Sequence, residues 1–310
     1  MKAIKIISVN LSEKKGTIKK QVPTIELMML GVKDDAHAGK WHRQVSLLGI
    51  ESIEKFTKEA GRTINFGEFA ENITTSGAEL WKFSPLDRLS CGDIELEVTQ
   101  IGKECHGTSC AIFKEVGNCV MPKEGIFCRV IRPGILQPGM EFIHHPKIYR
   151  IHIITLSDRA SEGEYEDLSG PRIKELIEKH FTIINCQLSI VNSLIPDDPE
   201  MLRDLLLKSK EDNIDFIITT GGTGIGPRDF TPDVVKPMID KEIPGIMELI
   251  RTKYGSLKPN ALISRSVAGV MGQSLVFTLP GSVKAVNEYM EEITKSMLHL
   301  VYMLHGLDRH

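Results

Sequence analysis

Residues 219–233 read Thr219-Thr220-Gly221-Gly222-Thr223-Gly224-Ile225-Gly226-Pro227-Arg228-Asp229-Phe230-Thr231-Pro232-Asp233, and this stretch is the strongest signal in the sequence. It follows an apolar run and precedes a segment that begins like a helix, with Thr231 as N-cap and Pro232 at the first helical position. Its glycines let the backbone approach a bulky ligand and direct N–H groups at anionic oxygens. The spacing fits neither a Walker A loop nor the Rossmann fingerprint. Ligands of open α/β sheets bind beyond the carboxyl ends of the strands, so we expect a ligand site at this loop.

Strand-like and helix-like patterns alternate on both sides of this loop. Apolar runs predict strands at 151–156, 183–190, 216–220 and 274–279. Helices are predicted at 169–180 and 199–210, and a long final helix is predicted from apolar residues that recur every three or four positions between Val286 and Leu304. Repeated strand–helix units predict an α/β domain whose mostly parallel sheet is covered on both faces.

The first half has a different texture. Short β-like runs at 3–9, 94–101 and 126–131 are separated by Gly- and Pro-rich turns. One helix is predicted from Ser46 to Ala60, with Gly61 ending it. The pattern predicts a mainly β, barrel-like domain over residues 1–146, and the segment from His144 to Lys147 is the best boundary with the α/β domain at 147–310.

Composition limits the functions that this chain can serve. Its 310 residues suffice for two domains, and the formal net charge is −3. That balance argues against a broad basic surface for nucleic acid. No apolar run reaches the length of a membrane span, and the amino terminus begins directly as a strand without a signal peptide. We therefore expect a soluble, cytoplasmic protein with small-molecule substrates and no nucleic-acid or membrane partner.

Two further loops of the second half carry candidate binding groups. Leu279-Pro280-Gly281-Ser282 lies between a strand and the final helix, and Ser282 is a good N-cap whose neighbouring N–H groups attract phosphate. In the segment from Ile195 to Glu200, Asp198 precedes Pro199 and is predicted to cap a helix, which leaves Asp197 spare. A spare carboxylate is a candidate for Mg²⁺, which binds through one or two carboxylates plus substrate phosphates. The alternatives are a solvated turn for Asp197 and a surface ion pair for Asp229 beside Arg228.

Residues 148–310 resemble the molybdopterin adenylyltransferases of molybdenum cofactor biosynthesis. The matching stretches are Ser157-Asp158-Arg159-Ala160-Ser161, Pro196-Asp197, Thr220 through Pro232, Ser264-Arg265 and Leu279 through Ser282. The resemblance implies a three-layer α/β fold, usually trimeric, that transfers AMP from Mg-ATP to the terminal phosphate of molybdopterin and releases pyrophosphate. It assigns Asp197 and Asp229 to catalysis and Mg²⁺ binding. The substrate- and nucleotide-binding residues that it implies are Ser157, Asp158, Thr220, Gly221, Gly222, Thr223, Gly224, Ser264, Pro280, Gly281 and Ser282.

The resemblance also implies partners. ATP and molybdopterin are the expected substrates, and the expected protein partners are molybdenum-insertion proteins, molybdopterin synthase and further copies of the chain. An alternative function is a non-catalytic protein that binds molybdopterin or the finished cofactor and delivers it. Mg²⁺-dependent release of pyrophosphate distinguishes the two.

The first half contains a candidate thiol site. Five of the six cysteines lie between Cys91 and Cys128, and Cys105 stands between Lys103 and His106, where a nearby positive charge favours the thiolate. Asp35, His37 and Arg43 are candidates for a polar cluster.

Together with Glu71-Asn72-Ile73-Thr74 and Gln100 through Cys110, these stretches resemble the MOSC domain, which is named after the carboxyl-terminal part of molybdenum cofactor sulfurase. The resemblance implies that Cys105 carries sulfur or contacts the metal of a molybdenum or tungsten cofactor. A third hypothesis is a zinc site formed by Cys105, Cys110, Cys119 and Cys128, although no CxxC pair is present.

Overall fold

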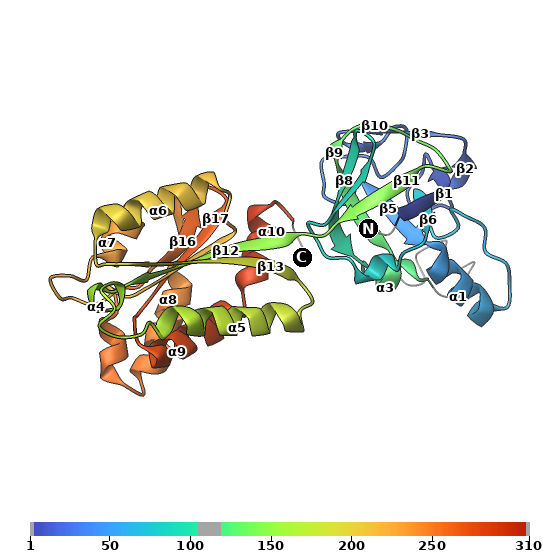
Figure 1. Cartoon of the computed structure of the whole chain (residues 1–310). Coiled ribbons are helices and arrows are strands. Elements are labelled where there is room, and N and C mark those ends of the chain that lie inside the picture. The colour runs from blue at the N-terminus through green and yellow to red at the C-terminus, as the bar shows by residue number, and fades with distance from the viewer. Residues whose placement is uncertain (1–2, 105–118, 308–310) are drawn as a thin grey trace. The chain divides into compact units, whose positions relative to one another are not determined.

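The structure is a computed structural model that describes residues 3–104 and 119–307. The chain divides into two compact units, which meet in sequence between Lys147 and Ile148 (Figure 1). No helix of the described residues is long and apolar enough to cross a membrane.

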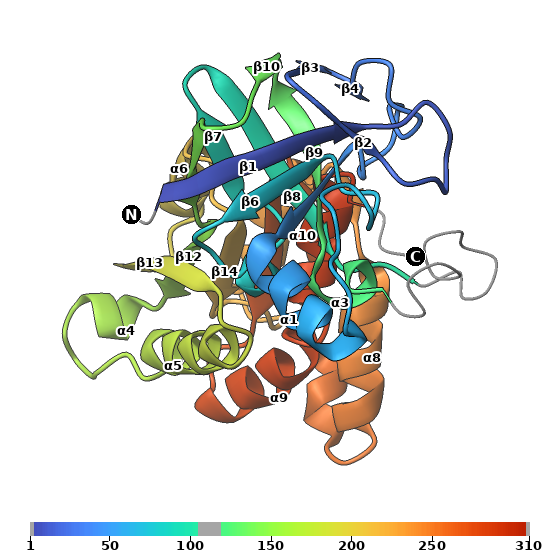
Figure 2. The ribbon, with the colours of Figure 1, turned by 90° about the vertical axis from the view of Figure 1, so that its right-hand side faces the viewer.

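The first unit is a closed β-barrel (Figure 2). In the described residues, neighbouring strands follow the order β11-β7-β8-β9-β5-β6-β1, and β1 pairs with β11 to close the ring. A short sheet of β10, β3 and β4 lies beside it. The elements are β1 (Ala3–Leu11), β2 (Lys20–Val22), β3 (Ile25–Met28), β4 (Gly31–Val32), β5 (Val45–Gly49), α1 (Ile50–Ala60), β6 (Ile73–Ser76), η1 (Leu80–Lys82), β7 (Arg88–Cys91), β8 (Ile94–Ile101), α3 (Met121–Glu124), β9 (Ile126–Arg132), β10 (Gly134–Leu136) and β11 (Glu141–His145).

Alternating side chains fill the barrel. In β1, Ile4 and Ile6 are buried while Lys5 faces solvent, which is the two-residue period of a strand with one face in the core. Leu47, Val98 and Phe142 from other strands are also fully buried and belong to the same core. The predicted mainly β, barrel-like domain is therefore confirmed.

One prediction for this unit was wrong in part. The predicted helix over 46–60 begins only at Ile50, because Val45–Gly49 is a strand buried between β6 and β9. A short, wholly buried apolar run has no periodicity that separates a strand from a helix. The predicted end was right, since Gly61 adopts φ +67° directly after α1.

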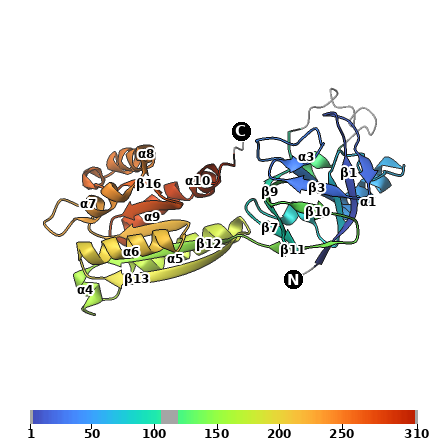
Figure 3. The same ribbon diagram turned by 90° about the horizontal axis from the view of Figure 1, so that it is seen from above.

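The second unit is an α/β domain (Figure 3). Its strand order is β13-β12-β14-β17-β16-β15. Its elements are β12 (Ile148–Leu156), α4 (Asp158–Ser161), α5 (Ser169–Ile183), β13 (Gln187–Ile195), α6 (Pro199–Glu211), β14 (Phe216–Thr220), α7 (Thr231–Val235), η3 (Lys236–Met238), β15 (Lys241–Glu242), α8 (Pro244–Gly255), η4 (Pro259–Ile263), β16 (Ala268–Met271), β17 (Ser274–Leu279), α9 (Val283–Ile293) and α10 (Met297–Leu304).

The sheet of this unit is parallel only in part. β13, β12, β14 and β17 run parallel, whereas the pairs β17–β16 and β16–β15 at one edge are antiparallel. Figure 1 shows α6 and α7 on one face of the sheet and α5, α8 and α9 on the other. The covered sheet agrees with the prediction, whereas the antiparallel edge was not predicted.

Two boundaries in this unit also differ from those predicted. The predicted strand 183–190 begins too early, because α5 continues through Ile183 and β13 begins only at Gln187, after a turn with Asn185 at φ +54°. The final helix is divided, since α9 ends at Ile293 and α10 begins at Met297. Both errors arise because the spacing of apolar residues continues across the short turn that ends the helix.

Candidate functional site

The predicted site residues of the second unit follow the carboxyl ends of its parallel strands. Leu156 at the end of β12 is in register with Ile195 of β13, and Thr220 of β14 is in register with Leu279 of β17. The loops that follow these strands therefore lie along one edge of the sheet, where α/β sheets bind ligands.

The first hollow at this edge is a polar cavity of about 340 Å³, here called the carboxylate cavity. It contains Asp158 from the start of α4 and Asp197 and Asp229 from two different loops, together with Arg228. The complete lining is Leu156, Ser157, Asp158, Arg159, Asp197, Gly222, Gly226, Pro227, Arg228 and Asp229.

Hydrogen bonds hold the carboxylates of Asp158 and Asp229 in place. The Asp158 side chain accepts from the Asp197 backbone N–H at 2.7 Å and from the Arg228 guanidinium at 2.7 Å. The Asp229 carboxylate accepts from the Gly226 backbone N–H at 2.8 Å. Arg228 therefore pairs with Asp158, and the alternative of an Arg228–Asp229 ion pair is not what the structure shows.

The charges around Asp197 are not fully balanced. Burial raises the pKa of the Asp197 carboxyl, and the negative charges of Asp158 and Asp229 raise it further. The Asp158 backbone N–H, which donates to the Asp197 carboxylate at 3.5 Å, and the charge of Arg228 oppose them. The neighbouring Asp198 is occupied as predicted, because its side chain accepts from the N–H groups of Glu200 and Met201 and caps α6. Asp197 is thus left as a carboxylate that a cation would stabilise.

The second hollow, here called the lysine cavity, has a volume of about 420 Å³ and shares Gly222 and Asp229 with the first. It combines two lysines, Lys258 and Lys284, with an apolar wall that includes Ile263. The complete lining is Gly222, Thr223, Gly224, Asp229, Lys258, Asn260, Ala261, Ile263, Ser264, Pro280, Gly281, Ser282, Lys284, Ala285, Glu288 and Tyr289.

Two features of the lysine cavity suit an anion. The neighbouring Lys258 lowers the pKa of the Lys284 ammonium, since two positive charges stand close together. The backbone N–H groups of Gly222, Thr223 and Gly224 donate to no acceptor among the described residues. Ser282 caps α9 by accepting from the Ala285 N–H.

Two predicted binding residues line neither cavity. Thr220 is fully buried and its hydroxyl donates to the Pro280 carbonyl at 3.0 Å, so its side chain joins two of the loops. Gly221 has φ +108° and its N–H donates to the Leu279 carbonyl. Ser264 does line the lysine cavity, and the Tyr289 hydroxyl donates to its oxygen at 3.0 Å.

Several residues at the site were not predicted from the sequence. Lys258, Asn260 and Tyr289 come from segments that carry no phosphate-binding pattern, so no sequence signal pointed to them. Asp167 was also missed, although its carboxylate accepts from Thr155, at the end of β12, and from the first N–H groups of α5.

The first unit contains a buried polar cluster. The side chains of Asp35 and Lys19 are fully buried and form an ion pair. Asp35 also accepts from the His37 backbone N–H at 3.0 Å and from Asn72 at 3.1 Å. Burial would raise the pKa of the Asp35 carboxyl, but the bonds from His37 and the charge of Lys19 outweigh it and lower that pKa.

The predicted trio Asp35, His37 and Arg43 is only partly brought together. His37 contacts Asp35, with its Nδ1 atom 3.4 Å from the carboxylate. Arg43 is connected through Trp41, since its guanidinium lies 4.9 Å from the centre of the indole ring and that ring stacks on His37. Lys19 was missed, because a lysine in a polar stretch looks like an ordinary surface residue.

The cysteine predictions are mostly beyond what the structure describes. Cys105 and Cys110 lie outside the described residues. Cys128 belongs to the barrel core, and burial raises the pKa of its thiol, which disfavours the thiolate that zinc requires. In residues 3–104 and 119–307, no three His, Cys, Asp or Glu side chains group as a metal cage.

Glu71 makes the stability of the barrel depend on pH. Its side chain accepts from the Gly67 N–H and the Thr74 hydroxyl, and burial raises the pKa of the carboxyl from 4.5 to about 6. The folded state therefore binds more protons than the unfolded state between these values, so the free energy of unfolding falls as pH rises through this window. The expected loss is about 2 kcal/mol between pH 4 and pH 7.

Glu71→Gln should remove this part of the pH dependence. Both tryptophans lie in the first unit, so denaturant titrations followed by tryptophan emission report on the barrel. Glu54→Gln, on the exposed face of α1, is the control for a change in net charge. An identical pH profile in wild type and Glu71→Gln would contradict the prediction.

Comparisons with known proteins agree with this architecture. The MOSC domain model matches residues 34–142, and the model described as a probable molybdopterin binding domain matches residues 152–299. The molybdopterin adenylyltransferase of Helicobacter pylori J99 is 34% identical over 157 residues, which cover 50% of this chain and 88% of the relative. Gephyrin of Dictyostelium discoideum is 32% identical over 162 residues, but these span only 22% of its length.

One solved structure is similar to this chain over about the same number of residues as the relatives above. The molybdopterin biosynthesis enzyme MoaB of Thermus thermophilus is 34% identical, with a TM-score of 0.47, and the match covers 51% of this chain and 98% of that one. The match to the Helicobacter pylori protein, which is 34% identical and covers 88% of that protein's length, shows the family of this chain. The chain therefore belongs to the molybdenum cofactor biosynthesis family that includes the molybdopterin adenylyltransferases, and it joins a MOSC domain to a probable molybdopterin binding domain.

Proposed function

We propose that the second unit transfers the adenylyl group of ATP to the terminal phosphate of molybdopterin and releases pyrophosphate. The observation that carries this proposal is the boundary between the two cavities, where Gly222 and Asp229 belong to both linings. A group transfer requires two substrates that meet at one point, and holding them there removes most of the entropic barrier. Relatives named molybdopterin adenylyltransferase support the same reaction.

The carboxylate cavity suits the triphosphate of Mg-ATP. Mg²⁺ shares its coordination between one or two carboxylates and substrate phosphates, so it does not need a cage made of protein alone. Asp197 and Asp229 would hold the ion from two loops of the same cavity. When bound, Mg²⁺ supplies positive charge that neutralises the phosphates. Arg228, whose side chain is 72% exposed, is placed to bind a phosphate oxygen in exchange for Asp158.

The lysine cavity suits molybdopterin, which joins a flat ring system to a phosphate. Ala261, Ile263, Pro280 and Ala285 supply an apolar wall for the rings. The two lysines and the unbonded N–H groups of the loop from Gly222 to Gly224 suit the anionic part.

The reaction itself needs little acid–base help. A phosphate oxygen of molybdopterin, largely ionised at neutral pH, forms a bond to the α-phosphorus of ATP. The bond from that phosphorus to the bridging oxygen breaks, and pyrophosphate leaves with the electron pair. The obstacle is the repulsion between two anions, so the side chains act by positioning the groups and by balancing their charge.

For the first unit we propose a cofactor-handling role, supported by the MOSC match and by the buried cluster around Asp35. Sulfur transport by Cys105 stays a prediction, because that residue lies outside the described part of the chain.

The proposal predicts turnover that depends on both substrates and on Mg²⁺. The purified 310-residue chain should release one pyrophosphate for each molybdopterin adenylylated, and removal of Mg²⁺ with EDTA should lower the rate by about 100-fold or more. ATP without molybdopterin is the control for simple hydrolysis. Tight molybdopterin binding without pyrophosphate release would contradict the transferase and favour the delivery protein instead.

A further inference from the structure

Arg265 bonds to the loop that carries Asp229, on the side that faces away from the two site cavities. Its Nε atom donates to the Gly224 carbonyl at 2.7 Å, one Nη atom donates to the Asp229 carbonyl, and the other donates to the Asp233 carboxylate at 2.7 Å. Its own backbone N–H donates to the Thr223 carbonyl at 2.9 Å. One planar group therefore bonds to both ends of the segment 224–229 and to the first turn of α7.

Besides Arg265, the bond from the Arg228 side chain to Asp158 connects this segment to another part of the site. Ile225 is 77% exposed. Asp229 keeps its carboxylate in place through the N–H of Gly226, which belongs to the same segment. The position of the Asp229 carboxylate thus follows the position of the segment, and Arg265 fixes the segment.

We propose that Arg265 is a positioning residue that sets the place of the Asp229 carboxylate for adenylyl transfer, an inference that rests on the proposed function. The guanidinium touches neither of the two site cavities, because Arg265 lines neither of them. Its five donors in a fixed plane suit this task, and a lysine ammonium cannot reproduce all three bonds. A displacement of about 1 Å at a reacting centre can reduce the rate about 100-fold.

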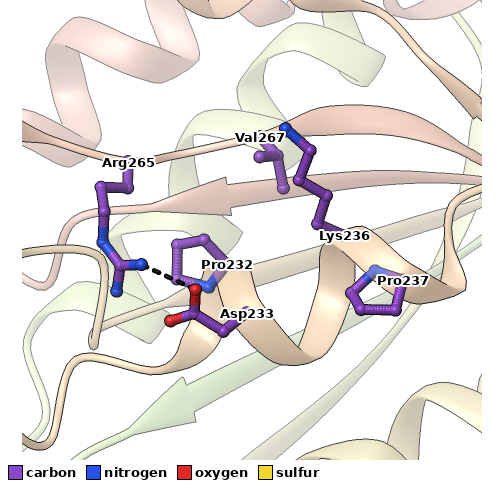
Figure 4. Close-up of a pocket in the computed structure, with 6 residues that line it drawn as sticks. All are labelled: Pro232, Asp233, Lys236, Pro237, Arg265 and Val267. Atoms are coloured by element: carbon purple, nitrogen blue, oxygen red, sulfur yellow. Dashed lines mark hydrogen bonds and ion pairs between the residues drawn. The ribbon is translucent and has the colours of Figure 1, made fainter.

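Arg265 also lines a third cavity, with a volume of about 480 Å³ (Figure 4). The figure shows the bond from Arg265 to Asp233 at one side of this cavity and Lys236 at the other. Its complete lining is Pro232, Asp233, Lys236, Pro237, Arg265 and Val267. Because the place of the guanidinium is open to solvent on this side, a free guanidinium ion can enter when the side chain is shortened.

This access allows a test by chemical rescue. Arg265→Ala should lower kcat about 100-fold and change the KM for ATP less than about threefold. Guanidinium chloride at about 20 mM, far below denaturing concentrations, should restore kcat in Arg265→Ala at least about tenfold. It should restore nothing in Asp229→Asn. Arg265→Lys should lie between wild type and Arg265→Ala.

Two further variants separate positioning from general structural damage. Asp233→Ala removes one bond but leaves both loop carbonyls with Arg265, so its kcat should fall less than about fivefold. Arg172→Ala removes an arginine that bonds to Asn287 and Glu175, away from both cavities, and should leave kcat unchanged. Equal losses in Asp233→Ala and Arg265→Ala would overturn the proposal, as would a loss in Arg265→Ala that guanidinium does not reverse.

The proposal can also be tested if the proposed function fails. Should the wild-type chain release no pyrophosphate, the transferase assignment is wrong, and hydrogen exchange still measures the loop. Arg265→Lys and Arg265→Ala should increase amide exchange in the segment 224–229 over wild type, while exchange in β14 and α6 stays the same. Unchanged exchange in that segment would refute a positioning role whatever the reaction is.

Discussion

Asp197→Asn and Asp229→Asn are each expected to lower adenylyl transfer about 1,000-fold or more, without unfolding the chain. Both carboxylates line the cavity proposed for the triphosphate and come from different loops. Asparagine has nearly the same shape, and its carbonyl oxygen can still accept the Gly226 N–H that Asp229 accepts now. The change therefore removes charge and leaves the fold intact, and in the proposed reaction charge placed in advance is the main source of catalysis.

The dependence on Mg²⁺ gives the same experiment a second readout. Each variant should need a higher Mg²⁺ concentration for half of its residual rate, because one of the two proposed ligands has lost its charge. Molybdopterin binding should stay within about threefold of wild type, since the lysine cavity keeps its lysines and its N–H groups.

Asp198→Asn is the matched control for the Asp197 variant. The two aspartates are adjacent in sequence, but the Asp198 carboxylate caps α6 and does not line the cavity. Asparagine caps a helix about as well as aspartate, so both rate and stability should be preserved. Full turnover in both single variants, Asp197→Asn and Asp229→Asn, would contradict the proposed metal site. A lower rate in Asp198→Asn would show that a change in the loop, rather than the lost charge, is responsible.

The sequence was informative about this site because its chemistry is local. Each predicted loop directly follows a strand, and parallel pairing brings such loops to one edge whatever the details of packing. The N-caps Ser282 and Asp198 were predicted correctly for the same reason, since a cap depends on neighbours in sequence. The predicted N-cap Thr231 was wrong, because Thr231 is the first residue of α7 and its hydroxyl donates to the Gly221 carbonyl instead. That Asp197 was left over could be inferred by elimination, and the structure shows it beside Asp158.

Contacts between distant segments could not be predicted in this way. Lys19 pairs with Asp35 inside the barrel, and the sequence around it gives no sign of burial. The three bonds of Arg265 join residues that are more than 30 positions apart. The strand β5 was mistaken for the start of a helix because all of its residues are buried, so its pattern shows no period.

Gly221→Ala is expected to destabilise the second unit by about 3–5 kcal/mol, the largest effect on stability that we predict. Two causes act together at this position. The residue has φ +108°, a conformation that alanine rarely adopts. A Cβ atom there would lie 2.3 Å from the Leu156 carbonyl oxygen, so the ends of β12 and β14 would have to separate.

Gly163→Ala separates the two causes. Gly163 also has a positive φ, +79°, but no atom lies within 4 Å of the place of its Cβ. Its substitution should therefore show the backbone strain alone, about 1 kcal/mol. If both variants lower the free energy of unfolding by the same amount, the close contact with the Leu156 carbonyl does not contribute to the effect.

The two units of the chain allow the effect to be assigned to one of them. All five tyrosines lie in the second unit and both tryptophans lie in the first. Gly221→Ala should lower the midpoint of thermal unfolding by roughly 10 °C when it is followed by tyrosine absorbance or by helical circular dichroism. The tryptophan transition should stay where it is in wild type. A parallel shift of both transitions would contradict the prediction, because the strain that the alanine introduces is confined to the loop edge where β12, β14 and β17 end.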